Sequence, residues 1–364
     1  MKEGWTTRKF SDIFDLQMGK TPSRDNSSYW GGTNTWVSIA DMNCGKYIYD
    51  TKEHITNSAV SESGIYRVSK DTVIMSFKLS IGKTAIATKD LYTNEAIMSF
   101  NTKEGFEILP DYIYYYLKGY KWQGMNKAVM GMTLNKKAIS NNIFSYPNTL
   151  QQQHIVEELD LLSSIIEKKK AQLNELDNLA QSLFYEMFGD PITNEKGWEI
   201  KTWKDVFETK TGKLNANAMV EGGIYPFFTC SKEISYIDTY AFDCEALLLA
   251  GNNASANYDV KYYKGKFNAY QRTYVLTIKE GAYPFYKISL EGKLSILQSH
   301  SLGGLTKYLT MGVLSGLSFI APPISLQQQF ASKIEAIEHQ KELIKQSIKE
   351  VETLFNSRMD YYFN

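Results

Sequence analysis

Residues 150–188 carry the longest regular apolar repeat in the chain, and this repeat limits what the chain can fold into. Apolar side chains recur there at alternating steps of four and three residues, interrupted only at Lys169, which is the heptad pattern of helices packed along a seam. The stretch holds no glycine or proline, Pro147 precedes it, and a Gly-Asp-Pro stop follows at residues 189–191. We therefore expect one long helix whose apolar seam needs a partner.

A second copy of this stretch occupies residues 326–363, where Lys341 and Arg358 interrupt the seam. The sequence Leu-Gln-Gln-Gln begins at Leu150 and again at Leu326, and the two seams superpose at an offset of 175 residues. The chain is therefore an internal duplication. The seam positions predicted to pack between the helices are Ile155, Leu159, Leu162, Ile166, Leu173, Leu176 and Leu183, and Phe330, Ile334, Ile337, Ile344, Ile348, Val351 and Phe355.

The segments before the two helices also repeat, because the sequence that opens at Trp5 returns at Trp198. Short runs rich in β-formers predict strands at residues 36–39, 46–49, 72–77, 84–87, 96–100, 246–249, 260–263 and 273–278, and a short helix is expected at residues 111–117. We predict an α+β protein with a mixed α/β domain at 1–146, a helix at 147–190, a second such domain at 191–322 and a second helix at 323–364.

The two globular regions diverge in their middles. Residues 76–87 of the first correspond in place to residues 249–260 of the second, yet they share little beyond polar side chains on a glycine-containing loop. The ends and helices therefore agree between the copies, whereas the candidate binding surfaces differ.

Charge is distributed unevenly although Lys+Arg and Asp+Glu both number 40. The regions 1–146 and 191–322 carry net charges of +4 and +2, and the helical regions carry −5 and −1. This partition is compatible with phosphate contact at the globular regions only. The chain lacks an apolar run of membrane-spanning length and a secretory leader, and its three cysteines form no CxxC pair, so we expect a cytoplasmic protein.

Motifs for catalysis or metal binding are missing from the sequence. Gly-Lys-Thr occurs at residues 19–21 and 82–84, but Phe14 and Phe77 stand where a phosphate-binding loop needs its first glycine. The four histidines are dispersed, and His154 and His339 lie on the helices away from the cysteines, so we expect no metal site. No nucleophile elbow, zinc-protease pair or two-metal carboxylate cluster is present, and we expect no catalytic residues.

The order of segments resembles the specificity subunits of type I restriction-modification systems. The resemblance is carried by residues 19–42 (GKTPSRDNSSYWGGTNTWVSIADM), the Gly-Trp openings, and the Leu-Gln-Gln-Gln helix starts that follow Pro147 and Pro323. It covers essentially the whole chain. Pro147-Asn148 stands where the family often has a double proline such as Pro322-Pro323.

The resemblance implies a non-catalytic DNA reader with two target-recognition domains, each of which binds half of a split target. The helices would pair antiparallel as a ruler, on which two methyltransferase subunits dock and restriction-translocase subunits join. S-adenosylmethionine would be a cofactor of the methyltransferase and not of this chain. About 38 residues at about 1.5 Å each give a rod of about 57 Å, against about 34 Å per turn of DNA, so half-sites on successive turns are within its reach.

DNA readers need cations for phosphates and forked or amide side chains for base edges. Arg24 and Arg272 rank first because a guanidinium fork fits guanine, although each could instead pair with a nearby acid. Trp36 and the many tyrosines could stack on a flipped or unstacked base, but aromatic side chains at strand positions are expected in the core. The predicted DNA-binding residues are Lys20, Thr21, Ser23, Arg24, Lys78, Lys83, Asn135, Lys136 and Lys137 in the first domain, and Lys213, Asn215, Asn217, Asn252, Asn253, Lys264, Lys266, Arg272, Thr306 and Lys307 in the second.

The sequence leaves two other classes of function to compare with a DNA reader. A coiled-coil scaffold or adaptor whose domains bind protein or polysaccharide fits the zero net charge. A stand-alone nuclease or methyltransferase would require motifs that the chain lacks. The divergent middles favour the DNA reader, because each half would then recognise a different sequence.

Overall fold

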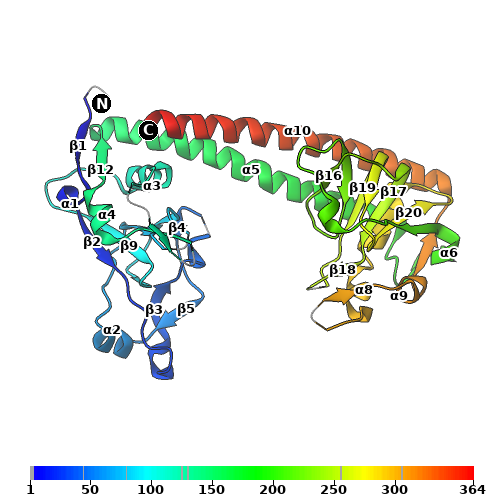
Figure 1. Ribbon diagram of the computed structural model, residues 1–364, viewed down its shortest axis with the longest axis horizontal. Coiled ribbons are helices and arrows are strands. Elements are labelled where there is room, and N and C mark those ends of the chain that lie inside the picture. The colour runs from blue at the N-terminus through cyan, green and yellow to red at the C-terminus, as the bar shows by residue number, and fades with distance from the viewer. Residues whose placement is uncertain are drawn as a thin grey trace. The chain divides into compact units, whose positions relative to one another are not determined.

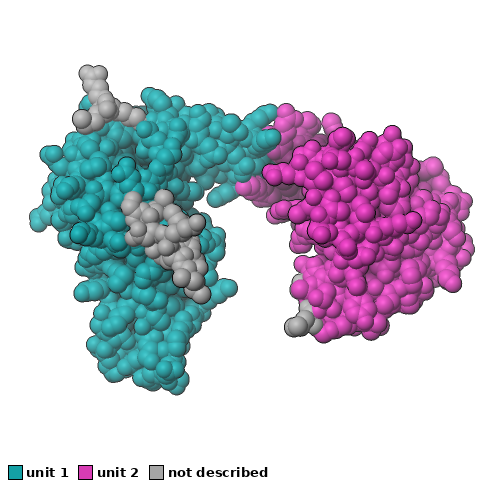
Figure 2. Space-filling model, in the orientation of Figure 1, with its two compact units in different colours: residues 1–168, 347–364 teal, residues 169–346 magenta. Residues whose placement is uncertain are grey.

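The computed structural model divides the chain into two compact units, residues 1–168 with 347–364 and residues 169–346 (Figures 1 and 2). It describes residues 4–43, 45–78, 80–123, 126–128, 131–254, 256–304 and 306–364. Each unit contains one α/β region together with parts of both long helices. The predicted α+β class with two duplicated regions and two long helices is confirmed.

The first unit is built mainly of antiparallel sheet. A five-stranded sheet has the order β2-β9-β6-β7-β4, with β4 parallel to β7, and a three-stranded sheet has the order β5-β3-β8. The elements are β1 (Thr6–Lys9), α1 (Phe10–Ile13), β2 (Phe14–Met18), η1 (Ser27–Tyr29), β3 (Trp30–Val37), η2 (Asp41–Asn43), β4 (Tyr47–Ile48), β5 (Glu53–Ile55), α2 (Asn57–Ser63), β6 (Val73–Ser76), β7 (Thr84–Ala87), β8 (Tyr92–Thr93), β9 (Ile97–Thr102), α3 (Pro110–Gly119), β10 (Asn126–Ala128), β11 (Gly131–Thr133), α4 (Lys136–Asn141) and β12 (Ile143–Tyr146).

The second unit repeats this plan with a six-stranded sheet in the order β14-β20-β17-β19-β15-β16. The pair β13-β22 is its counterpart of β1-β12, and both pairs join the two ends of their region. The elements are β13 (Glu199–Thr202), α6 (Trp203–Val206), β14 (Phe207–Thr211), η3 (Ala216–Ala218), β15 (Tyr225–Phe228), β16 (Ser235–Ile237), β17 (Phe242–Ala250), β18 (Asn252–Asn253), β19 (Val260–Ala269), β20 (Thr273–Ile278), α7 (Tyr283–Glu291), α8 (Leu294–His300), β21 (Lys307–Tyr308), α9 (Met311–Ser315) and β22 (Ser318–Ala321).

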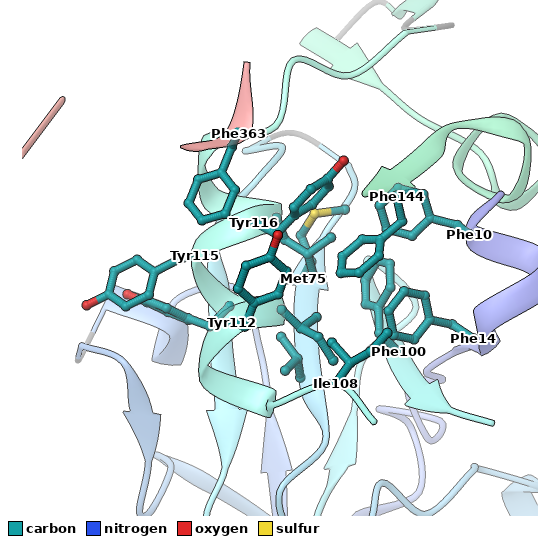
Figure 3. Close-up of a cluster of buried hydrophobic side chains, with 14 of the residues drawn as sticks. Phe10, Phe14, Met75, Phe100, Ile108, Tyr112, Tyr115, Tyr116, Phe144 and Phe363 are labelled. Atoms are coloured by element: carbon teal, nitrogen blue, oxygen red, sulfur yellow. The ribbon is translucent and has the colours of Figure 1, made fainter. Parts of the chain in front are cut away.

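Aromatic rings fill the core between sheet and helix in the first unit (Figure 3). Phe144 lies between Phe14, with ring centroids 5.1 Å apart, and Tyr116, at 4.2 Å. Phe363 packs on the same helix α3, at 5.7 Å from Tyr112. The last turn of the second long helix is therefore part of the core of the first unit.

The long helices α5 (Thr149–Phe188) and α10 (Ile324–Phe363) each run for 40 residues. In the first unit the beginning of α5 packs against the end of α10, where Glu158 binds Arg358. In the second unit the end of α5 packs against the beginning of α10, where the Phe184 and Phe330 rings are 5.7 Å apart. The two helices are therefore antiparallel, as the resemblance implied.

The polar interruptions of the second seam form ion pairs across the helix pair. Lys341 Nζ lies 2.7 Å from Asp177 Oδ1 of α5. Arg358 Nη2 lies 2.9 Å from Glu158 Oε2. A polar side chain in an apolar seam favours the alignment that provides its partner, so these pairs help to fix the antiparallel register.

The buried face of each helix moves by one residue toward its end. Leu183 is only half-buried, whereas its neighbour Phe184 is 1% exposed. Met359 is likewise buried beside the half-buried Arg358. A straight helix drifts by about 20° per heptad against a strict seven-residue repeat, so after four heptads from Ile155 the residue after the heptad position faces inward. Most other predicted seam positions are buried or half-buried as well.

The Leu-Gln-Gln-Gln sequences provide a buried amide at the start of each long helix. Gln152 is 0% exposed; its Oε1 accepts from Leu109 N at 2.9 Å, and its Nε2 donates to Pro147 O at 3.0 Å. Gln327 is 3% exposed and repeats this, accepting from Ala282 N at 3.1 Å and donating to Pro322 O at 2.9 Å. Leu109 and Ala282 are the N-cap residues of α3 and α7. Each glutamine therefore joins a long helix to the first turn of a shorter one.

We expect Gln152→Met to lower the free energy of unfolding by about 1–3 kcal/mol, because the substitution keeps the side-chain volume but leaves buried backbone groups unpaired. Urea denaturation measures the change. Gln153→Met is the matched control, since Gln153 is exposed and bonds only Glu157 among the described residues. Equal effects of the two substitutions would contradict the assigned role of Gln152.

We also expect a pH dependence from the helix pair. The hydrogen bond from Arg358 is the largest influence on Glu158 and lowers the pKa of its carboxyl group, and Tyr362 adds to it. A carboxyl group with a lowered pKa in the folded state stabilises the fold above its unfolded pKa of about 4.3, and this contribution is lost as the pH falls through the folded pKa. Glu158→Gln should therefore destabilise the protein at pH 7 by at most about 1 kcal/mol, and the difference from the wild type in urea denaturation should shrink below about pH 5. A destabilisation by Glu158→Gln that is the same at pH 7 and below about pH 5 would contradict this prediction.

Candidate nucleic-acid interface

Three segments of the first unit meet at one end of its five-stranded sheet. Two backbone hydrogen bonds hold the loop after β2: Gly19 N donates to Ile97 O at 3.1 Å, and Lys20 N donates to Thr93 O at 2.8 Å. The segment after β6 is held by Phe77 N to Ala96 O at 2.9 Å, and Leu134 N donates to Phe77 O at 2.9 Å. These backbone bonds bring together the predicted residues Lys20, Thr21, Lys78 and Asn135.

The second unit repeats three of these four backbone bonds, those of Gly19, Phe77 and Leu134. Gly212 N donates to Thr273 O at 3.4 Å, Gly251 N donates to Arg272 O at 2.8 Å, and Leu309 N donates to Gly251 O at 2.8 Å. Gly19 and Gly212 occupy equivalent places. A Cβ on Gly19 would lie 2.2 Å from Thr93 Oγ1, and one on Gly212 would lie 1.8 Å from Ala269 O, so both close approaches require glycine. We call this shared set of backbone bonds the frame.

Arg24 is engaged within the first unit. Its Nη2 donates to Glu53 Oε2 at 2.9 Å, and its guanidinium lies 3.8 Å from the centroid of the Trp30 ring. The carboxylate raises the pKa of Arg24, and the side chain remains exposed. Arg24 thus has the acidic partner that was considered as its alternative, and any base contact would have to displace or share Glu53.

The other predicted residues of the first unit lie around the same sheet end. Lys83 Nζ donates to Asn43 Oδ1 at 2.7 Å, and Lys83 N bonds Ser76 Oγ at 3.2 Å in the turn after β6. Asn135 is the N-cap of α4, because its Oδ1 accepts from Ala138 N at 2.8 Å. Exposed side chains at this end belong to Lys20, Ser23, Lys136 and Lys137, while Lys78 is half-buried.

In the second unit, several predicted residues lie beside the frame. Asn252 and Asn253 form β18, which pairs with β21 so that Asn253 lies opposite Lys307. Gln271 Nε2 donates to Asn215 Oδ1 at 2.8 Å. Within the described residues, no carboxylate forms an ion pair with Arg272, which is exposed. Lys213, Asn217 and Thr306 are exposed nearby in sequence.

Lys264 and Lys266 are not brought to this end. They lie on β19 opposite Glu245 and Asp243 of β17, whereas the frame meets β17 at its end, where Ala250 pairs with Thr273. Lys264 Nζ binds Glu245 Oε2 at 3.1 Å. Lys266 Nζ lies 4.8 Å from the centroid of the Tyr240 ring. Their clustering in the sequence reflects strand alternation and not a shared site.

Sequence reasoning missed Glu53 and Glu95 of the first unit and Gln271 of the second, which lie beside predicted residues of their own unit. Thr21 Oγ1 donates to Glu95, and this bond is the largest influence that lowers the pKa of Glu95. Glu95 and Gln271 both lie in the turn that precedes a frame strand, β9 or β20. Aligning the Lys-Glu-Gly sequences at 103–105 and 279–281, which follow these strands, would have paired them.

The described residues contain no cluster of three or more metal-ligating side chains. Among the same residues, no helix is long and apolar enough to cross a bilayer. Cys230 and Cys244 are free thiols, while Cys44 lies outside the described residues.

The fold and the frame define a protein with two related α/β regions and one pair of antiparallel helices. The family model described as "Type I restriction modification DNA specificity domain" matches residues 2–178 and again 195–353. The chain therefore belongs to that family, and the family's domain occurs twice in it.

Individual relatives agree. The chain is 30% identical over 234 residues to the MjaIX specificity subunit of a type I restriction enzyme from Methanocaldococcus jannaschii, covering 57% of this chain and 52% of that protein. It is 35% identical over 154 residues to the EcoDI specificity subunit of Escherichia coli, covering 42% and 34%. These matches thus span about half or less of each relative. The crystal structure of a type I system S subunit from M. genitalium shares the fold, with a TM-score of 0.58 and 13% identity over 98% of this chain and 95% of that one.

We expect Glu53→Gln to strengthen non-specific binding of duplex DNA, because it removes a negative charge and releases Arg24 for phosphate contact. The slope of log K against log salt concentration should steepen by up to about one. Glu104→Gln is the control, since it makes the same charge change at the exposed turn after β9. Indistinguishable slopes for the two variants would show that the ion pair with Glu53 does not keep Arg24 from contacting phosphates.

Proposed function

We propose that this chain is the DNA-specificity subunit of a type I restriction-modification complex. Each α/β region reads one half of a bipartite target in double-stranded DNA, and the helix pair sets the distance between the halves. The chain supplies recognition and no catalytic residue. Adenine methylation, with S-adenosylmethionine, belongs to two methyltransferase subunits docked on the helices, and cleavage belongs to restriction-translocase subunits.

The single observation that carries this proposal is the shared frame with different side chains. Both units repeat the close approach at glycine and the backbone bonds of the frame. The residue after the one that both donates and accepts a frame bond is nevertheless Lys78 in the first unit and Asn252 at the equivalent position of the second. A scaffold that bound one partner twice would be expected to repeat the side chains as well as the backbone. Two different base sequences require different polar groups on a common support.

The family membership supports the same reading, because the matching model is that of a DNA specificity domain and it occurs twice. The exposed leucines Leu179 and Leu354 lie 175 residues apart, one on each long helix. Apolar side chains in equivalent exposed places suit two copies of one partner. This supports the assignment of two docked methyltransferase subunits.

We expect the full-length chain, purified with a methyltransferase partner, to bind one bipartite duplex sequence far more tightly than others. Affinity for that sequence should fall steeply with salt, by at least about tenfold between about 50 and 200 mM, because phosphate contacts release counterions. Fluorescence anisotropy with labelled duplexes measures both. Binding indifferent to sequence and salt would favour the scaffold function.

A further inference from the structure

Glu95 and Gln271 occupy the same place in the two frames. Glu95 lies in the turn between β8 and β9, and Gln271 lies in the turn between β19 and β20. The residues that follow them, Ala96 and Arg272, accept equivalent backbone hydrogen bonds of the frame, from Phe77 N and Gly251 N. Both side chains are exposed. The two units thus present different chemical groups at one equivalent position, which we call the turn tip.

Each turn-tip side chain is oriented by the loop that follows the equivalent glycine. Thr21, two residues after Gly19, donates its hydroxyl to the Glu95 carboxylate. Asn215, three residues after Gly212, accepts from Gln271 Nε2 at 2.8 Å. These contacts restrict the rotamers of side chains that would otherwise move freely in solvent, and restricted side chains lose less entropy on binding.

The groups at the two turn tips differ in what they can bind. The bond from Thr21, outweighing partial burial, lowers the pKa of Glu95, and the charges of Lys78 and Arg24 lower it further. The carboxylate is therefore ionised at neutral pH and only accepts hydrogen bonds, with acceptor capacity remaining beyond the Thr21 bond. Gln271 has both an acceptor oxygen and a second N–H, beside a hollow of about 340 Å³ that Arg272 also lines.

Under the proposed function, Glu95 beside Lys78 and Arg24 lies on a surface that faces DNA phosphates, where a carboxylate would weaken binding unless it met a donor. In the major groove the exocyclic amino groups of cytosine and adenine are donors, whereas guanine O6 and thymine O4 are acceptors that would repel it. A carboxamide matches adenine, which offers N7 as acceptor and the N6 amino group as donor. A carboxylate suits cytosine better than adenine, because adenine N7 is an acceptor that would repel the second carboxylate oxygen, so the two side chains suit different bases.

We propose that the turn-tip residues are specificity-determining base readers, Glu95 accepting from the N4 amino group of cytosine in one half of the target and Gln271 binding adenine N6 and N7 in the other. Thr21 and Asn215 are their positioning residues. This inference rests on the proposed function and assigns two of the bases that it leaves open.

The test is selection of bound duplexes from a randomised DNA library by the full-length chain with its methyltransferase partner, followed by sequencing. Glu95→Gln should change one position in one half from cytosine to adenine, by at least about tenfold in relative enrichment, and leave the other half unchanged. Gln271→Glu should change one position in the other half from adenine to cytosine. Glu95→Ala and Gln271→Ala should abolish the preference at those same positions.

Matched controls are Glu104→Gln and Gln298→Glu, which make the same exchanges at exposed places away from the turn tips, and which should select the wild-type sequence. Thermal unfolding verifies that each variant is folded. A wild-type motif with unchanged bases in all four turn-tip variants would overturn this inference and leave the proposed function intact. No motif for the wild-type chain would overturn the proposed function, and this inference with it.

Discussion

The antiparallel packing of α5 against α10 is the interaction on which the rest of the structure depends. Each unit takes the beginning of one helix and the end of the other into its core, with Ile155 and Phe363 in the first unit and Phe330 and Phe184 in the second. Each core therefore needs residues of both long helices, so neither copy of the duplicated sequence forms its core from its own residues alone. The ion pairs of Lys341 and Arg358 fix the register, and the buried Gln152 and Gln327 fix how each helix begins.

On this support the two units keep one backbone arrangement and vary what it displays. The constraint is steric at Gly19 and Gly212, where no side chain fits, and permissive immediately beyond them, where side chains are exposed. A frame of backbone hydrogen bonds carries no sequence information of its own, which allows Glu95 to be exchanged for Gln271 without a change of fold. Under the proposed function, the two regions can therefore recognise different sequences while they share one helix pair.

The sequence predicts the long helices and most central strands because their apolar periodicity is local. It could not give β1-β12 or β13-β22, because each of these strands is only four residues long and pairs with a partner more than a hundred residues away. The heptad pattern also misplaces the inward face at Phe184 and Met359, since a straight helix departs from a seven-residue repeat. For the surface, composition identifies lysines but not their neighbours: it could not show that Glu53 holds Arg24 or that β19 carries Lys264 away from the frame.

Deleting one heptad from each helix tests the account most directly. Residues 168–174 and 342–348 lie opposite one another in the register set by the Glu158–Arg358 and Asp177–Lys341 pairs, so their joint removal preserves the remaining contacts. The rod would shorten by about 10 Å, or about three base pairs. Sequencing of selected duplexes should then show both half-sites unchanged and the spacer shortened by about that amount. Unchanged half-sites with the wild-type spacer would contradict the claim that the helix pair measures the target.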